Sequence, residues 1–217
     1  MAEPLHETFV VAYVLGVTPG KWAGIWNDRM PRHPLALRPC SPAEAVAALV
    51  SGEAHVALLR LPLPEDTLNS IPLYSIPLYV EKPVVVVPKD HAVEALDSVT
   101  VRDLENETLL DADWAADVEL VAANVGVAVM PQSVARALSR RDVVARPVSD
   151  GPETQVALAW LTTSTEVEEF IGIVRGRTAN SSRGEPTPKT PKPAKPAKAA
   201  RPARAKRPSG PRKPRRR

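Results

Sequence analysis

Two short stretches combine residue types that could hold a small anion. Thr18, Pro19 and Gly20 open a predicted helix, where free backbone N–H groups and the helix dipole favour a carboxylate. The alternative for Thr18 is a plain N-cap. Arg60 ends a predicted strand at the same sheet edge, where its guanidinium could form paired hydrogen bonds with a carboxylate. The alternative for Arg60 is an ion pair with an acid of the same domain.

Other reactive side chains do not assemble into a catalytic or metal-binding pattern. His33, His55 and His91 are not at metal-ligand spacing, and Cys40 is the single cysteine, which indicates a buried or loop thiol. Ser41 lacks the Gly-x-Ser-x-Gly context of a nucleophile and is better read as a helix cap. The sequence therefore predicts no metal, no cofactor and no enzymatic activity.

The charges divide the chain into two parts of opposite sign. From residue 175 onward there are 16 of the 28 Lys and Arg residues and one acid, Glu185, a net charge of +15. The preceding residues hold the other 12 basic and 24 acidic residues, a net charge of −12. Such asymmetry indicates a polyanionic partner for the C-terminal part alone.

The first part of the chain alternates between predicted strands and helices. In order, these elements are a strand over 8–14, a helix over 19–29, a strand over 35–38, a helix over 42–50 and a strand over 55–60. Ser41 and Glu44 form a capping-box sequence, and Gly52 ends the second helix. These spacings predict a parallel sheet with right-handed crossovers.

The later elements are shorter. They are predicted as two extended runs within 71–87, a helical turn at 101–104, strands at 109–110, 127–130, 143–148 and 155–160, and helices ending near 123 and spanning 133–139 and 166–175. Asn124 and Gly126 suit the exit from a helix because both tolerate positive φ. Ser133 is predicted to cap the helix that follows.

The stretch from Glu119 to Ser133 resembles the signature of the effector-binding domain of LysR-type transcriptional regulators. In that family, a helix ending in a Val-Ala-Ala-Gly-like segment leads to Gly-Val-Ala-like strand residues and then Pro; here Asn124 stands where Gly is usual. Further segments are similar to the family's first strand and effector loop, its strand ending in Arg, its two crossovers and its closing strand: 9–20, 51–60, 76–91, 143–148 and 156–160. Together the resemblance covers roughly residues 8–175.

The resemblance implies an α/β fold of the periplasmic-binding-protein type, with two Rossmann-like lobes. Lobe I is expected over about 8–75 and 149–175, and lobe II over about 80–145. Lobe II is expected to be truncated, because about nine residues separate Leu110 from the helix containing Glu119, too few for a crossover of ~10–12 residues. The family's N-terminal winged helix-turn-helix and linker helix are also expected to be absent, because the sequence opens on a strand.

The resemblance further implies an effector site between the lobes and a homodimer. Thr18, Pro19, Gly20 and Arg60 would contact the effector from lobe I. Asp111, Pro131 and Gln132 would line the facing lobe. The implied effector is a small organic acid.

Residues 176–217 are predicted to be a disordered basic tail, because they contain no large apolar residue to bury. Lys and Arg residues that neutralise phosphates release counterions, so such a tail predicts DNA or RNA binding without sequence preference. The predicted contacts are Lys189, Lys192, Lys195, Lys198, Arg201, Arg204, Lys206, Arg207, Arg212, Lys213, Arg215, Arg216 and Arg217. The alternatives are a solubilising tail and a tail that contacts the acidic domain.

The sequence thus predicts a LysR-family transcriptional-regulator-like protein that binds a small anionic effector and contacts DNA weakly through its tail. The alternative is a nucleoid- or RNA-associated interaction protein whose globular domain no longer binds a ligand. No apolar stretch approaches the ~20 residues of a membrane helix and no signal peptide is evident, which predicts a cytoplasmic protein without membrane partners.

Overall fold

The computed structural model describes residues 7–63 and 71–177. The chain divides into two units, Met1–Ser182 and Arg183–Arg217, and all described residues belong to the first. The predicted tail contacts from Lys189 to Arg217 lie outside the described residues. No helix in the described part of the chain is long and apolar enough to cross a membrane.

A five-stranded sheet contains the first predicted elements. Its strands are β1 (Phe9–Val14), β2 (Leu35–Cys40), β3 (Val56–Leu61), β4 (Tyr74–Glu81) and β9 (Thr154–Trp160), in the order β2-β1-β3-β9-β4. β1 pairs in parallel with β2 and β3, whereas β9 runs antiparallel to β3 and β4. The parallel arrangement predicted for the first three strands is confirmed.

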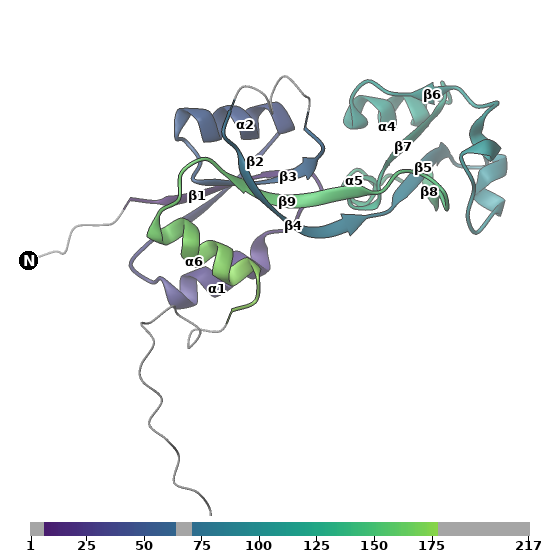
Figure 1. Cartoon of the computed structure of the whole chain (residues 1–217). Helices are drawn as coiled ribbons and strands as arrows, with labels where there is room; N and C mark the ends of the chain where they lie inside the picture. The colour runs from purple at the N-terminus through teal and green to yellow at the C-terminus, as the bar shows by residue number, and fades with distance from the viewer. Residues whose placement is uncertain (1–6, 64–70, 178–217) are drawn as a thin grey trace, which may run out of the picture. The chain divides into compact units, whose positions relative to one another are not determined.

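Three helices accompany this sheet: α1 (Gly20–Arg29), α2 (Pro42–Ser51) and α6 (Thr165–Val174) (Figure 1). An aromatic cluster lies in the core, where Phe9 stacks on Trp26 with 4.5 Å between ring centroids and lies 5.6 Å from Phe170. All three rings are almost wholly buried. Burial of such large apolar rings is a main contribution to the stability of this half of the domain.

A four-stranded sheet contains the later strands. They are β5 (Pro83–Pro88), β6 (Leu109–Leu110), β7 (Val127–Pro131) and β8 (Val143–Pro147), in the order β6-β7-β5-β8. Every residue of β5 is buried, as its continuous run of valines predicts for a strand covered on both faces. One apolar cluster joins the sheet to α4 (Trp114–Ala122) and α5 (Gln132–Ala137), and another to the 3-10 turns η1 (Ala92–Ala95) and η2 (Arg102–Leu104).

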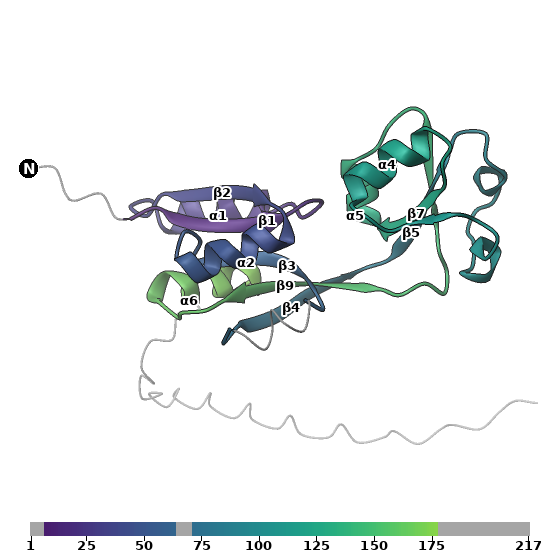
Figure 2. The same ribbon diagram turned by 90° about the horizontal axis from the view of Figure 1, so that it is seen from above.

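Two chain passages connect the sheets. Lys82 alone separates β4 from β5, and residues 148–153 separate β8 from β9. The paired strands β4 and β9 lead toward the second sheet in both views (Figures 1 and 2). Only residues 111–113 join β6 to α4, so the expected shortening of this connection is present. The predicted α/β fold is confirmed, and each of its two sheets is mixed, with both parallel and antiparallel pairs.

Local capping sequences explain how several helices begin and end. The predicted capping box at α2 is present, because Ser41 N–H donates to Glu44 Oε2 at 2.8 Å and Glu44 N–H donates to Ser41 Oγ at 3.3 Å. Gly52 ends α2 with φ 76°, a left-handed conformation that glycine adopts without a steric cost.

Two predicted caps are wrong. Thr18 does not cap α1: the N-cap is Pro19, no side chain bonds to it, and Thr18 is exposed. Ser133 does not cap α5, because it lies inside the first turn. Its hydroxyl instead accepts a hydrogen bond from Arg60 Nη2 at 2.9 Å, a tertiary contact that replaces the local one.

The exit from α4 matches the prediction at one residue and differs at another. Asn124 has φ 59°, as expected for a residue that tolerates the left-handed region. Gly126 does not have positive φ. Glycine is required at this position for a different reason: any Cβ would overlap the carbonyl oxygen of Thr108.

Candidate functional site

A pocket of about 410 Å³ opens at the carboxyl ends of the three parallel strands. Open α/β sheets commonly bind small ligands at this edge. The lining residues come from the ends of β1, β2 and β3 and the starts of α2 and α4: Val14, Leu15, Pro39, Cys40, Ser41, Pro42, Arg60, Asp113 and Trp114. Most of these side chains are apolar, so the pocket suits a small organic molecule with an apolar body and one polar group.

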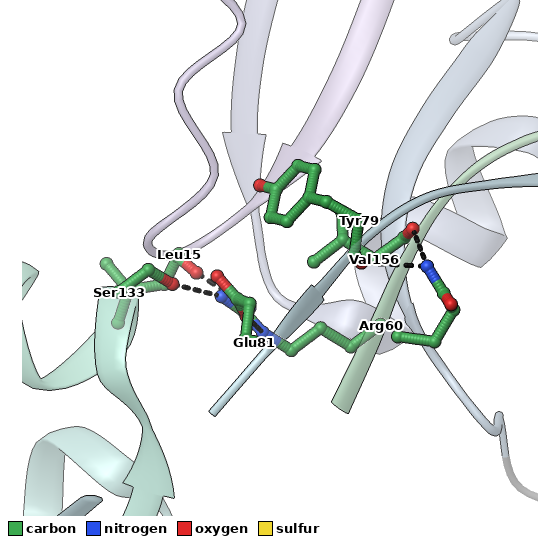
Figure 3. Close-up of polar contacts among 7 residues, drawn as sticks. Leu15, Arg60, Tyr79, Glu81, Ser133 and Val156 are labelled. Atoms are coloured by element: carbon green, nitrogen blue, oxygen red, sulfur yellow. Dashed lines mark hydrogen bonds and ion pairs between the residues drawn. The ribbon is translucent and has the colours of Figure 1, made fainter. Parts of the chain in front are cut away.

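Arg60 is the cationic side chain in the pocket wall. It lies near the end of β3, which is buried between β1 and β9, and the residue is only 8% exposed. Its Nε donates to Glu81 Oε2 at 2.7 Å, its Nη1 to the carbonyl oxygen of Leu15 at 2.7 Å and its Nη2 to Ser133 Oγ at 2.9 Å (Figure 3). Three of the five N–H groups of the guanidinium thus donate to protein atoms.

Arg60 connects elements of the two sheets. Leu15 follows β1 and Glu81 ends β4, whereas Ser133 belongs to α5 of the other half. The guanidinium carbon also lies 5.5 Å from the ring centroid of Trp114 in α4, within the range of a cation–π contact. One side chain therefore links β3 to helices that cover the four-stranded sheet.

Gly16 allows the loop after β1 to approach α5. It has φ 85°, and a Cβ there would lie 2.6 Å from Ser133 Oγ and 2.9 Å from the backbone nitrogen of Val134. Only glycine fits this backbone without strain and without displacing the helix. The same approach brings the carbonyl of Leu15 within reach of Arg60.

The ion pair between Arg60 and Glu81 leaves this wall of the pocket without net charge. Glu81 is 7% exposed, so both partners are shielded from water. Two opposite charges removed from water must compensate each other, since either one alone would be strongly destabilising. Asp113, at the pocket rim, is exposed and adds a negative charge.

Glu81 lies where the chain passes from one sheet to the other. It is the last residue of β4, and Lys82 follows before β5 begins. The carbonyl of Lys82 accepts a hydrogen bond from the backbone N–H of Gln132 at 3.0 Å. Tyr79, two residues earlier, has its carbonyl bonded to Gln155 Nε2 at 2.7 Å. The position of Glu81 is therefore fixed on both sides.

Burial perturbs two titratable groups at this edge of the sheet. Burial raises the pKa of the Cys40 thiol, which makes its thiolate scarcer at neutral pH. Burial also raises the pKa of the Tyr79 phenol; the Glu81 carboxylate adds to this shift and Arg60 opposes it. Cys40 is therefore a structural thiol that lines the pocket and not an activated nucleophile.

The structure brings one of the predicted effector contacts into this pocket. Arg60 lines it, and its partner is an acid of the same domain, the alternative that the sequence left open. Thr18 and Gly20 are exposed and Pro19 is buried as the α1 cap, and none of the three lines the pocket.

The predicted contacts of the facing lobe also lie outside the lining. Asp111 is exposed in the short connection before α4. Pro131 is buried at the end of β7 and pairs with Pro83. Gln132 is exposed and contributes a backbone N–H to the carbonyl of Lys82.

Sequence reasoning missed most of the pocket wall. The sequence predicts a structural thiol at Cys40 and a helix start at Ser41 and Pro42, and the same three residues also line the pocket. The signal that could have found them is their position just after a strand that runs parallel to β1, because the carboxyl ends of such strands meet at one edge. Trp114 follows a strand in the other half of the domain, and only the tertiary structure brings it here.

Comparisons with known proteins show which domains this chain is similar to. Residues 20–117 match the LysR substrate binding domain family. No curated protein matches the chain. A full-length mutant of BenM superposes with a TM-score of 0.65 at 16% identity, over 80% of this chain and 68% of that one. The structure titled BenM effector binding domain with its effector benzoate gives a TM-score of 0.65 at 17% identity, over 79% and 92% of the two chains.

A mutant of the OxyR regulatory domain from Pseudomonas aeruginosa has the same fold. Its TM-score is 0.61 at 20% identity, over 79% of this chain and 96% of that one. The chain is therefore similar to LysR-type substrate-binding domains over residues 20–117, and it has the periplasmic-binding-protein-like fold of these effector-binding domains. At these identities the structural likeness concerns the fold, and what the pocket binds must be argued from its own residues.

Proposed function

We propose that this protein is a LysR-family transcriptional-regulator-like protein that senses a small anionic effector in the pocket at the ends of β1, β2 and β3. The observation that carries the proposal is the guanidinium of Arg60 in the wall of a mostly apolar pocket of about 410 Å³. A small acid with an apolar body would place its carboxylate toward Arg60 and its body against Trp114 and Leu15. Benzoate, the effector named for the BenM domain, has this chemistry.

Cys40 offers a direct test, because it lines the pocket and is the single cysteine of the chain. Benzoate bound in the pocket should shield the thiol and slow its alkylation by iodoacetamide in proportion to occupancy. It should also raise the melting temperature, since a ligand that binds only the native state stabilises it. A matched control moves the thiol to an exposed site: in Cys40→Ser with Glu153→Cys, benzoate should leave alkylation unchanged. Unchanged alkylation and melting across benzoate and a panel of other small organic acids would contradict the proposal.

We further propose that the basic residues after Arg175 give the protein weak, sequence-independent contact with DNA. The support is the density of positive charge, 14 Lys and Arg residues against one acid in residues 178–217. Each phosphate neutralised contributes about −0.9 to the slope of log affinity against log salt. Gel shifts at two salt concentrations should show steep salt dependence for the full chain and loss of binding for a chain ending at Arg175. Equal binding by the truncated chain would rule out this role.

A second function is favoured by one feature of the site. Arg60 is held by an internal set of partners, Glu81, Leu15 and Ser133, and such a set would also suit a domain that serves a nucleoid- or RNA-associated protein as an interaction module without a ligand. This alternative predicts tail-dependent nucleic-acid binding without any response of Cys40 alkylation to organic acids. LysR substrate-binding domains are regulatory, and neither function requires catalysis. A homodimer is part of both proposals, and light scattering on the full chain tests it.

A further inference from the structure

Glu81 already pairs with the positive charge of Arg60 that an acidic ligand in the pocket would seek. The Nε of Arg60 donates to Glu81 Oε2 at 2.7 Å, and both residues are over nine-tenths buried. A charge-assisted hydrogen bond of this kind is among the stronger polar contacts in proteins. The cation in the pocket wall therefore has an internal counter-ion before any ligand arrives.

A ligand carboxylate at Arg60 would bring two negative charges to one buried guanidinium. Like charges at this distance repel strongly where water is excluded, and shared sites of this type do not keep both carboxylates ionised and close. The exposed carboxylate of Asp113 at the pocket rim adds repulsion, although water screens it. A neutral ligand of the same shape meets neither penalty.

In the described part of the chain, the pocket lining offers an acidic ligand no cation other than Arg60. Across the described residues that line the pocket, Arg60 is the one Lys or Arg side chain. Burial raises the pKa of the Tyr79 phenol on the same strand, and the negative charge of Glu81 adds to this shift. Lys82 follows Glu81 but is exposed. The balance between Arg60 and Glu81 thus determines the charge that a ligand encounters.

We propose that Glu81 sets the charge specificity of the pocket by competing with an acidic effector for Arg60. This inference rests on the proposed ligand pocket and adds a specificity-determining residue to it. Anions bind weakly while the ion pair between Glu81 and Arg60 is intact, and they bind tightly only when that ion pair breaks. Uncharged ligands of the same shape are indifferent to Glu81.

The test compares benzoate with benzamide, which has nearly the same shape and no charge, on the full chain at fixed pH and salt. Glu81→Gln keeps an oxygen that accepts from Arg60 Nε but removes the competing charge. It should tighten benzoate binding by about ten-fold or more, the scale expected for relief of one close like charge, and change benzamide binding by less than about two-fold. Glu169→Gln removes a similar charge from the half-buried pair with Arg29, which does not line the pocket, and should change the binding of neither ligand. Melting temperature verifies that each variant is folded.

The outcomes separate this inference from the proposed function. Equal changes for benzoate and benzamide, or no gain for benzoate in Glu81→Gln, would overturn the role of Glu81 while leaving the pocket itself intact. If neither benzoate nor benzamide binds to any variant, and neither slows Cys40 alkylation, the proposed pocket and this inference are both wrong. Where Glu81→Gln fails to fold, Glu81→Asp withdraws the carboxylate by one methylene and should give a smaller gain for benzoate alone.

Discussion

Replacement of Arg60 by Met tests how far the buried ion pair holds the domain together. The change removes three hydrogen bonds and the contact with Trp114, and it leaves the carboxylate of Glu81 buried without its cation. Loss of one partner from a buried pair costs about 3–5 kcal/mol of unfolding free energy. In a protein of this size, each kcal/mol shifts the melting temperature by about 2–4 °C, which predicts a fall of roughly 6–20 °C.

Calorimetry and urea unfolding measure this loss, and a double-mutant cycle identifies its cause. Arg60→Met combined with Glu81→Met removes both charges, and it should be less destabilised than Arg60→Met alone, because apolar replacements of a buried pair are often nearly neutral. The exposed pair of Arg38 and Glu53, whose side chains are 47% and 59% exposed, is the matched control. Arg38→Met should leave the melting temperature nearly unchanged, because exposed ion pairs contribute little to stability. A loss at Arg60 as small as at Arg38, or additive effects in the cycle, would refute the reasoning.

Three further predictions concern the surroundings of the pocket, and Gly24→Ala in α1 serves as the control for the first. Gly16→Ala should lower the unfolding free energy by about 2–4 kcal/mol in urea titrations, because of its φ of 85° and the overlap with Ser133. Gly24→Ala, where a Cβ meets open space within α1, should instead stabilise by up to about 1 kcal/mol. Ser41→Ala removes the side-chain cap of α2 and should cost about 1 kcal/mol by the same titration. Burial raises the pKa of the Cys40 thiol, so its alkylation at pH 8 should be slower than that of a free thiol and should keep rising with pH beyond the point where a free thiol's rate levels off.

The helices and strands could be predicted from the sequence because capping, glycine exits and burial patterns depend on residues close together in the chain. The capping box of Ser41 and Glu44 determines where α2 begins, and Gly52 determines where it ends. The continuous valines of β5 indicated a strand buried on both faces, and every residue of it is buried. In each case the residues that determine the element lie inside it or next to it in the sequence.

The candidate site depended on contacts that no local pattern contains. Ser133 looked like a helix cap, yet its hydroxyl accepts from Arg60, 73 residues earlier in the chain. The sequence left Arg60 with two open interpretations, a ligand contact and an internal ion pair, because Glu81 is one of many acids in the domain. The sheet determines which acid is the partner. β9 lies between β3 and β4 and aligns the ends of those two strands, so that Glu81 comes within reach of Arg60.

If a ligand carboxylate replaced Glu81 at Arg60, contacts between the two halves of the domain would change as well. One guanidinium holds the loop after β1 through Leu15, the end of β4 through Glu81 and the start of α5 through Ser133. Glu81 is also one residue from the start of β5, so its release would remove a restraint at the passage between the sheets. A ligand can shift a conformational equilibrium only by as much as its affinity differs between the two states. An acid that binds in exchange for Glu81 has such a difference built into its contacts, whereas a neutral molecule that fills the same pocket beside an intact ion pair does not.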